Sequence, residues 1–116
     1  MLKKLYRLDK KEFTTAFQKG RSFNLPHFVL KYKASPYPYA RLGVSCGLRV
    51  SKKATIRNRM KRRIMEAFRQ RADAFLRGDY IIIVKPGTEK EPFATMKDEL
   101  IQSLISLNEK NNNIAH

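Results

Sequence analysis

The chain of 116 residues lacks most features of secreted and membrane-bound proteins. Its single cysteine, Cys46, has no partner for an internal disulfide and no neighbours at metal-ligand spacing, which favours a reducing compartment. No run approaches the roughly 20 apolar residues that cross a bilayer, and the opening residues MLKKLYRLDK lack the apolar core of a secretory signal. We therefore expect a cytoplasmic protein with no membrane partner.

Acidic residues are scarce, because ten Asp and Glu stand against 25 Lys and Arg and leave a net charge of +15. Residues 1–87 carry a net charge of +17, whereas residues 88–116 carry −2. Such self-repulsion opposes a compact state unless a polyanion neutralises it. The distribution favours nucleic acid as the partner, with an anionic membrane surface as the second choice.

Patterns suited to catalysis or metal binding are also missing from the sequence. No carboxylate pair and no His/Cys cluster has the spacing that acid–base chemistry or metal coordination requires. The two histidines are His27, beside Pro26 in an expected loop, and His116 at the end of the chain. We therefore expect no catalytic residue and no dedicated metal site on the protein.

Apolar residues make up 42% of the chain, which is enough for one folded domain. We expect a single domain over residues 1–110 and a disordered polar tail over residues 111–116. Periodicity and turn residues predict three helices, from Asp9 to about Lys19, from about 53 to 76, and from Pro92 onward, and Gly78 is expected to end the second of them. They predict four strands, at 21–23, 28–33, 41–48 and 79–87. The order α-β-β-β-α-β-α predicts an α+β sandwich of a sheet and helices.

The most unusual segment is Lys52–Arg71, which holds nine basic residues and one acid, Glu66. An apolar residue recurs within it every three or four positions, so the segment reads as a helix with one face on a core. That apolar stripe consists of Ile56, Met60, Ile64, Ala67, Phe68, Ala72 and Phe75. On the other side, like charges stack at steps of four and repel, whereas an ordinary solvated face mixes signs. The pattern therefore favours a phosphate backbone as the ligand of this face over a merely solvated surface.

Arginine predominates in this block, and its planar fork binds phosphate oxygens with two hydrogen bonds. Asn58 lies among the arginines although asparagine is a poor residue inside a helix. Its amide both donates and accepts, which suits a base edge or a 2′-hydroxyl. The alternative is a local hydrogen bond near the helix N-terminus.

The stretch KKATIRNRMKRRIMEAFR resembles the RNR signature of the bacterial ribonuclease P protein family. The signature residues match in register at Ala54, Arg57, Asn58, Arg59, Met60, Lys61 and Arg62. The opening LKKLYRLDKKEFTTAFQKGRSF and the segments FVLKY, RLGVS and DYIIIVKPG are similar to the family in the same order, so the resemblance covers about residues 2–107. Met65 departs from it, because the family usually has another arginine there.

The resemblance implies a two-layer sandwich with a four-stranded sheet and a left-handed βαβ crossover, a fold also found in the second domain of a small-subunit ribosomal protein. It further implies a 1:1 complex with a catalytic RNA subunit, which removes the 5′ leader of precursor tRNA. Mg²⁺ would be bound by that RNA and the substrate, and the protein would assist substrate binding. Catalysis would reside in the RNA.

Two RNA-binding surfaces follow from this resemblance. The first, on the RNR helix, would contact the catalytic RNA through Arg57, Asn58, Arg59, Lys61, Arg62 and Arg63. The second would be a cleft for the single-stranded leader, formed by Phe13, Phe17, Lys10, Arg7, Lys31, Lys33 and Ser22. Lys31 and Lys33 alternate with Leu30 and Tyr32, so we expect the lysines on a basic sheet face and Tyr32 in the core.

Phe13 and Phe17 lie one helical turn apart and would stack on bases, although a pair at this spacing often belongs to a core. Three alternatives stay open for the whole chain. A structural RNA-binding protein of the ribosome needs the basic helix but not the cleft. A DNA-binding helix-turn-helix needs a helix where a strand is expected before residue 53. A protein ribonuclease needs a catalytic group that the sequence pattern lacks.

Overall fold

The computed structural model describes residues 3–72 and 75–114, with side chains described as far as Leu107. Its elements in chain order are η1 (Lys4–Tyr6), α1 (Lys10–Lys19), β1 (Arg21–Asn24), β2 (Phe28–Lys33), β3 (Ala40–Ser45), α2 (Ala54–Arg71), β4 (Gly78–Val84), η3 (Thr88–Lys90) and α3 (Phe93–Ile114). The predicted order of helices and strands is therefore confirmed. None of the described helices is long and apolar enough to cross a membrane.

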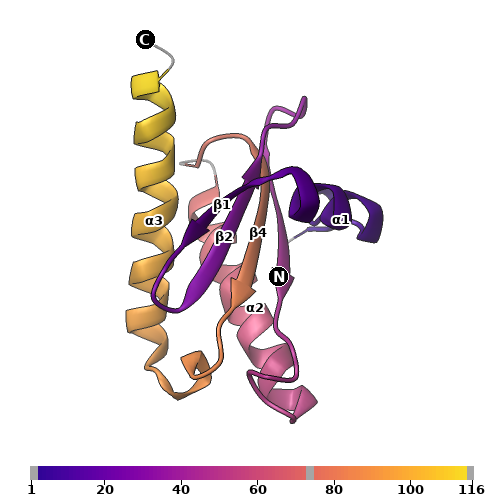
Figure 1. Cartoon of the computed structure of the whole chain (residues 1–116), viewed down its shortest axis with the longest axis vertical. Helices are drawn as coiled ribbons and strands as arrows, with labels where there is room; N and C mark the ends of the chain where they lie inside the picture. The colour runs from indigo at the N-terminus through magenta and orange to yellow at the C-terminus, as the bar shows by residue number, and fades with distance from the viewer. Residues whose placement is uncertain (1–2, 73–74, 115–116) are drawn as a thin grey trace.

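The four strands form one mixed sheet in the order β1-β2-β4-β3. β2 pairs antiparallel with β1 and β4, whereas β3 and β4 are parallel. Parallel neighbours need a crossover, which α2 provides behind the sheet, and this β3-α2-β4 crossover is left-handed (Figure 1). The α+β class and the hand of the crossover are both as expected.

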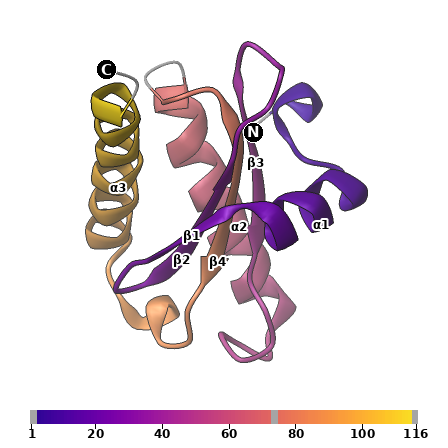
Figure 2. The ribbon, with the colours of Figure 1, turned by 45° about the horizontal axis from the view of Figure 1, so that its top comes forward.

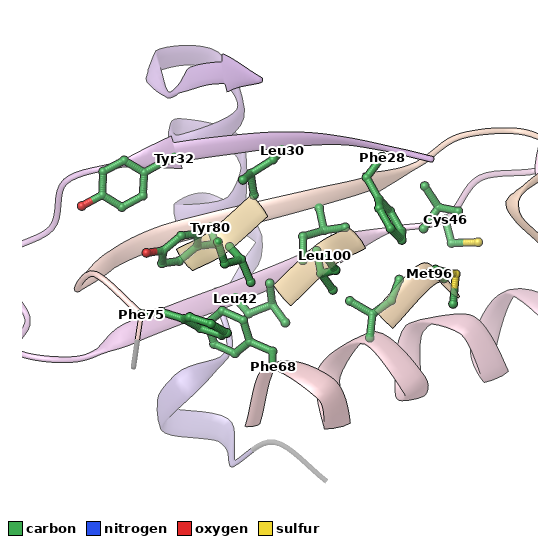
Figure 3. Close-up of a cluster of buried hydrophobic side chains, with 14 of the residues drawn as sticks. Phe28, Leu30, Tyr32, Leu42, Cys46, Phe68, Phe75, Tyr80, Met96 and Leu100 are labelled. Atoms are coloured by element: carbon green, nitrogen blue, oxygen red, sulfur yellow. The ribbon is translucent and has the colours of Figure 1, made fainter. Parts of the chain in front are cut away.

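The core lies between one face of the sheet and the helices α2 and α3 (Figure 3). Because strand side chains alternate, every second residue of β2 points into it, and Tyr32 is buried there as predicted. The apolar stripe of α2 supplies Met60, Ile64 and Phe68. The stripe expected on the last helix, consisting of Phe93, Met96, Leu100, Leu104 and Leu107, also packs on this core.

Helix α1 covers the opposite face of the sheet (Figure 2). Its N-terminus has a capping box, because the Asp9 carboxylate accepts from the Glu12 backbone N–H and the Glu12 carboxylate accepts from that of Asp9. This pair of bonds satisfies two of the donors that a helix N-terminus leaves free. The helix ends at Lys19, before Gly20, as the sequence predicts.

Several boundaries differ from the expectations, and β4 ends at Val84 rather than at 87. β3 ends at Ser45 rather than at 48, because the chain turns over residues 48–50 to enter α2. α2 ends at Arg71 rather than at 76, and Phe75 reaches the core from beyond the helix, with its ring 5.2 Å from that of Phe68. The helical spacing of apolar residues continues past the end of α2 because α2 and the segment with Phe75 both face the same core. Residues 73 and 74 of the expected helix lie outside the described residues.

α3 continues to Ile114, so residues 111–114 are helical where a disordered tail was expected, and residues 115 and 116 lie outside the described part. Gly78 was expected to close the middle helix but begins β4 instead. Its φ is +147°, and a Cβ at this position would lie 2.4 Å from the Tyr32 ring. Glycine is therefore required for the approach of β4 to β2.

Gly78→Ala should lower the free energy of unfolding by about 2–4 kcal/mol, through backbone strain and overpacking against Tyr32. Gly47→Ala is the matched control, because a Cβ there meets no atom within 4 Å. Urea denaturation of both variants measures the difference. Equal stability of the two variants would contradict the assigned role of Gly78.

Candidate nucleic-acid interface

The first candidate surface is a shallow hollow on the solvent side of α2, which we call the RNR hollow. It is lined by Thr55, Asn58, Arg59, Lys61, Arg62 and Met65. The helical period brings these residues to one side, because the apolar stripe of the same helix is fixed against the sheet. Four of the six predicted RNR contacts therefore share one surface.

The other two predicted residues of this helix lie at its flanks. Arg57 is half-buried and donates from Nη1 to the backbone carbonyl of Ser51 at 2.9 Å, so its side chain supports the turn that precedes α2. Arg63 is exposed, and its guanidinium carbon lies 5.2 Å from the ring centroid of Phe93 at the start of α3. Neither residue lines the RNR hollow.

Charge in the RNR hollow is not neutralised by the protein's own acids. Within the described chain, no Asp or Glu forms an ion pair with Arg59, Lys61 or Arg62. The Asn58 amide likewise has no hydrogen-bond partner among the described residues, which removes the alternative of a local bond. The hollow therefore presents free donors to a ligand.

Glu66, the one acid of α2, bonds instead to Arg69 one turn further on. The hydrogen bond from Arg69 lowers the pKa of the Glu66 carboxyl to about 2. Cys46 lies buried near the start of α2, where burial raises the pKa of its thiol against the lowering effect of Lys61 and Arg57. Neither group removes positive charge from the RNR hollow.

The second candidate surface lies where α1 crosses the sheet and consists of Phe13 and Phe17 with Lys31; we call it the phenylalanine cleft, after the cleft expected there. The rings of Phe13 and Phe17 are stacked, with centroids 6.4 Å apart and planes 16° apart. Phe13 is half-buried over Gly43, whereas Phe17 is 42% exposed. The Lys31 ammonium lies 4.5 Å from the Phe17 ring centroid and donates to the Phe17 carbonyl at 3.0 Å.

The structure divides the other predicted cleft residues. Ser22 pairs with Lys31 across β1 and β2, and Lys10 lies on the same side of α1 as the two phenylalanines. Arg7 instead lies beside the edge of β3, where it bridges to Leu42. Lys33 is half-buried and lies among Thr15, Ser35 and Pro36, on the other side of α1. Arg7 and Lys33 thus line two different hollows beside the phenylalanine cleft, and their contact with a leader stays a prediction.

A buried ion-pair network holds α1 on the sheet, and sequence analysis missed it. Arg41 on β3 is 7% exposed and donates to both carboxylate oxygens of Asp79 on β4, at 2.9 and 3.0 Å. Its remaining Nη1 donates to Glu12, the capping residue of α1. Burial lowers the pKa of Arg41, but the bonds to Asp79 and Glu12 outweigh it and raise the pKa above its ordinary value. Only the parallel register of β3 and β4 brings Arg41 opposite Asp79.

His27 does not belong to either surface. Its ring Nδ1 is 3.0 Å from one carboxylate oxygen of Glu99 on α3, and its backbone N–H donates to the other oxygen. These contacts fasten the β1–β2 turn to α3. Among the described residues, no group of three or more His, Cys, Asp or Glu side chains is arranged to hold a metal ion.

Comparison with known proteins by sequence and by structure gives relatives of one kind. Residues 2–108 match the family model described as ribonuclease P. The chain is 35% identical over 106 residues to the ribonuclease P protein component of a Geobacillus species, covering 89% of this chain and 90% of the relative. It is 30% identical over 104 residues to that of Streptococcus mutans, covering 89% and 87%.

Two solved structures have the same fold. The RNase P protein from Thermotoga maritima superposes with a TM-score of 0.78 at 27% identity, covering 86% of this chain and 96% of that chain. The RNase P protein from Staphylococcus aureus superposes with a TM-score of 0.73 at 25% identity, covering 93% and 92%.

Asp79→Asn should lower the free energy of unfolding by about 3 kcal/mol, because it removes the main counter-charge of a buried guanidinium. Glu66→Gln is the control, since it breaks an exposed pair with Arg69 that water solvates, and it should change stability little. Both values come from urea denaturation. Similar small losses in the two variants would mean that the Arg41 network does not stabilise the fold.

Proposed function

Because the chain belongs to the ribonuclease P protein family, we propose that it binds the catalytic RNA subunit with the RNR hollow and the leader of precursor tRNA with the phenylalanine cleft. The chain is a protein component of an endoribonuclease that processes tRNA. The observation that carries the proposal is the RNR hollow, a fixed cationic surface without acidic partners among the described residues. The complex would contain one protein and one RNA subunit, in the cytoplasm.

The RNR hollow suits a folded RNA because its donors are of two kinds. The guanidinium groups of Arg59 and Arg62 match phosphate oxygens, and the Asn58 amide matches a base edge or a 2′-hydroxyl. α2 is anchored by a buried apolar stripe, so the helix that carries these groups is fixed before the RNA arrives. A rigid surface loses less conformational entropy on binding than a flexible one.

The phenylalanine cleft suits a leader of any sequence. Phe17 offers a partly exposed ring, and Lys31 beside it offers a cation for the backbone. A base stacks on an aromatic ring with about 1–3 kcal/mol whatever its identity. The cleft would therefore hold a single strand by stacking and charge, without reading bases. A structural ribosomal protein has no need of such a cleft.

The chemical step is assigned to the catalytic RNA. Water would break the phosphodiester bond between the leader and the mature tRNA, and Mg²⁺ bound by the RNA and the substrate would supply charge stabilisation. The protein's own residues would position the leader through Phe17 and Lys31 and would neutralise phosphates through the RNR hollow. Because added positive charge offsets repulsion between two RNAs, the protein would lower the Mg²⁺ concentration that cleavage needs.

Reconstitution tests the proposal directly. Adding the protein to the catalytic RNA at low Mg²⁺ should restore 5′ maturation of precursor tRNA, and the Arg59→Ala/Arg62→Ala variant should restore it only at higher protein concentration. Affinity for the catalytic RNA should fall at least about tenfold. The slope of log K against log salt concentration should decrease by about 1 in magnitude for each phosphate contact that is lost.

The charge-matched control for this variant is Arg71→Ala/Lys90→Ala, which removes two exposed cations outside the RNR hollow. An equal loss of affinity in the control would mean that net charge, rather than the hollow, is responsible. Cleavage of precursor tRNA by the protein with no RNA present would contradict the assignment of catalysis.

Phe17→Ala should weaken binding of the reconstituted complex to precursor tRNA by about 5- to 100-fold and leave binding of mature tRNA unchanged, because only the precursor has a leader to stack. Gln18→Ala, at the next exposed position of α1, is the control. Dissociation constants for both RNAs give the result. A precursor preference that survives in Phe17→Ala would rule out leader stacking on this ring.

A further inference from the structure

A second aromatic surface lies at the end of the sheet where the β2–β3 loop projects (Figure 2). We call it the tyrosine hollow, and its lining includes Lys4, Leu5, Arg7, Tyr37, Tyr39 and Arg41. Four large apolar side chains are exposed in the described part of the chain, and two of them, Leu5 and Tyr37, line this hollow. None of the preceding assignments uses the tyrosines of this hollow.

The backbone on both sides of Tyr37 is restricted. The loop reads SPYPY, so Tyr37 follows Pro36 and precedes Pro38. Proline fixes its own φ, and it confines the residue before it to extended conformations. The backbone N–H of Tyr37 also donates to the Ser35 hydroxyl at 3.3 Å. The loop therefore holds an exposed ring in one place, which lowers the entropy lost when a ligand binds.

The ring of Tyr37 packs against two neighbouring side chains, Arg41 and Tyr39. The guanidinium carbon of Arg41 lies 4.2 Å from its centroid, and Arg41 is itself fixed by Asp79 and Glu12. On the loop side, Tyr39 lies 5.7 Å from Tyr37 and 5.1 Å from Tyr6, between centroids. With this support Tyr37 remains 41% exposed, close to the value for Phe17. Part of its aromatic surface is therefore accessible to a ligand.

The charges around the hollow favour an anion beside that ring. Of the two acids in its lining, Glu12 is paired with Arg41, and Asp9 accepts a hydrogen bond from the backbone N–H of Glu12. Lys4 and Arg7 at its rim have no acidic partner among the described residues. An aromatic platform with free cations at its rim is the combination that binds single-stranded nucleic acid.

The tyrosine hollow and the phenylalanine cleft are neighbours on one face of the sheet. Tyr37 lies over Arg41 and Phe13 lies over Gly43, two residues further along β3. Two residues of a strand span about 7 Å. A single strand that leaves the phenylalanine cleft along this face can therefore reach the tyrosine hollow.

We propose that the tyrosine hollow binds one base of single-stranded RNA, in the part of the 5′ leader beyond the segment held at Phe17. Tyr37 stacks on the base, and Lys4 and Arg7 bind the adjacent phosphates. The proposal rests on the proposed function, because it assigns the occupant as a leader. Leader contacts would thus extend from the phenylalanine cleft past the first turn of α1 to the end of the sheet.

Tyr37 also covers the Arg41 guanidinium, and a purely structural role would consist of that cover alone. The two roles make different predictions for conservative variants. Stacking needs the ring and not the hydroxyl, so Tyr37→Phe should bind as the native protein does. Tyr37→Leu keeps apolar cover over Arg41 but loses the aromatic face, so it should bind leaders as weakly as Tyr37→Ala.

The experiment uses the complex reconstituted from the full chain and the catalytic RNA, with precursor tRNAs whose leaders increase in length. Tyr37→Ala and Tyr37→Leu should weaken binding about tenfold for long leaders and leave short leaders and mature tRNA unaffected. A fluorescent base analogue moved stepwise along a long leader should be quenched at one position by native protein and Tyr37→Phe, but not by Tyr37→Leu. Thermal unfolding of each variant reports its stability.

Four results would overturn the proposal. Unchanged binding of long leaders by Tyr37→Leu, while Phe17→Ala still weakens it, would remove the tyrosine hollow and leave the proposed function standing. A loss that is equal for long leaders and mature tRNA, or a loss of affinity for the catalytic RNA alone, would show that the hollow does not hold the leader. If neither Phe17→Ala nor Tyr37→Leu affects binding of any leader, the leader assignment itself fails.

Discussion

Burial of one side of α2 against the sheet is the contact on which both the fold and its charge distribution depend. Met60, Ile64 and Phe68 enter the core between the sheet and α3, and their burial fixes the rotation of the helix. Because the basic side chains lie on the other side of the helix from this stripe, they face outward, where water weakens their mutual repulsion but does not remove it. The apolar contact therefore holds in place a set of like charges that would otherwise oppose the helix.

The two faces of the sheet are covered in different ways. One face is covered by α2 and α3 and contains the rings of Tyr32, Tyr80 and Phe68 (Figure 3). The other is only partly covered, and α1 is fastened to it by a buried charge network as well as by the apolar contacts of Ala16 and Phe13. Arg41 connects β3, β4 and the cap of α1, and it also supports Tyr37. The positions of both aromatic surfaces thus depend on one guanidinium group.

The sequence predicted elements well and boundaries poorly. Periodicity identified α2 and its stripe, but the same spacing carried the prediction past Arg71, since Phe75 faces the same core from outside the helix. Gly78 was read as a helix end because glycine commonly is one, whereas its positive φ and the nearby Tyr32 ring give it a place in β4. The cleft residues predicted from the family resemblance were grouped as one set. The structure separates Arg7 and Lys33 from Phe13, Phe17 and Lys31.

The sequence by itself determined that a helix with one apolar and one basic side follows a strand-rich half, because both periods are local properties of the chain. It also determined the basic balance and, through the RNR signature, the family. Only the tertiary structure decided which charged side chains form ion pairs within the protein and which face solvent. Arg41, Asp79 and Glu12 look like any other surface residues along the chain. The register of β3 on β4 and the crossing of α1 bring them together, and no local pattern encodes contacts between residues so far apart.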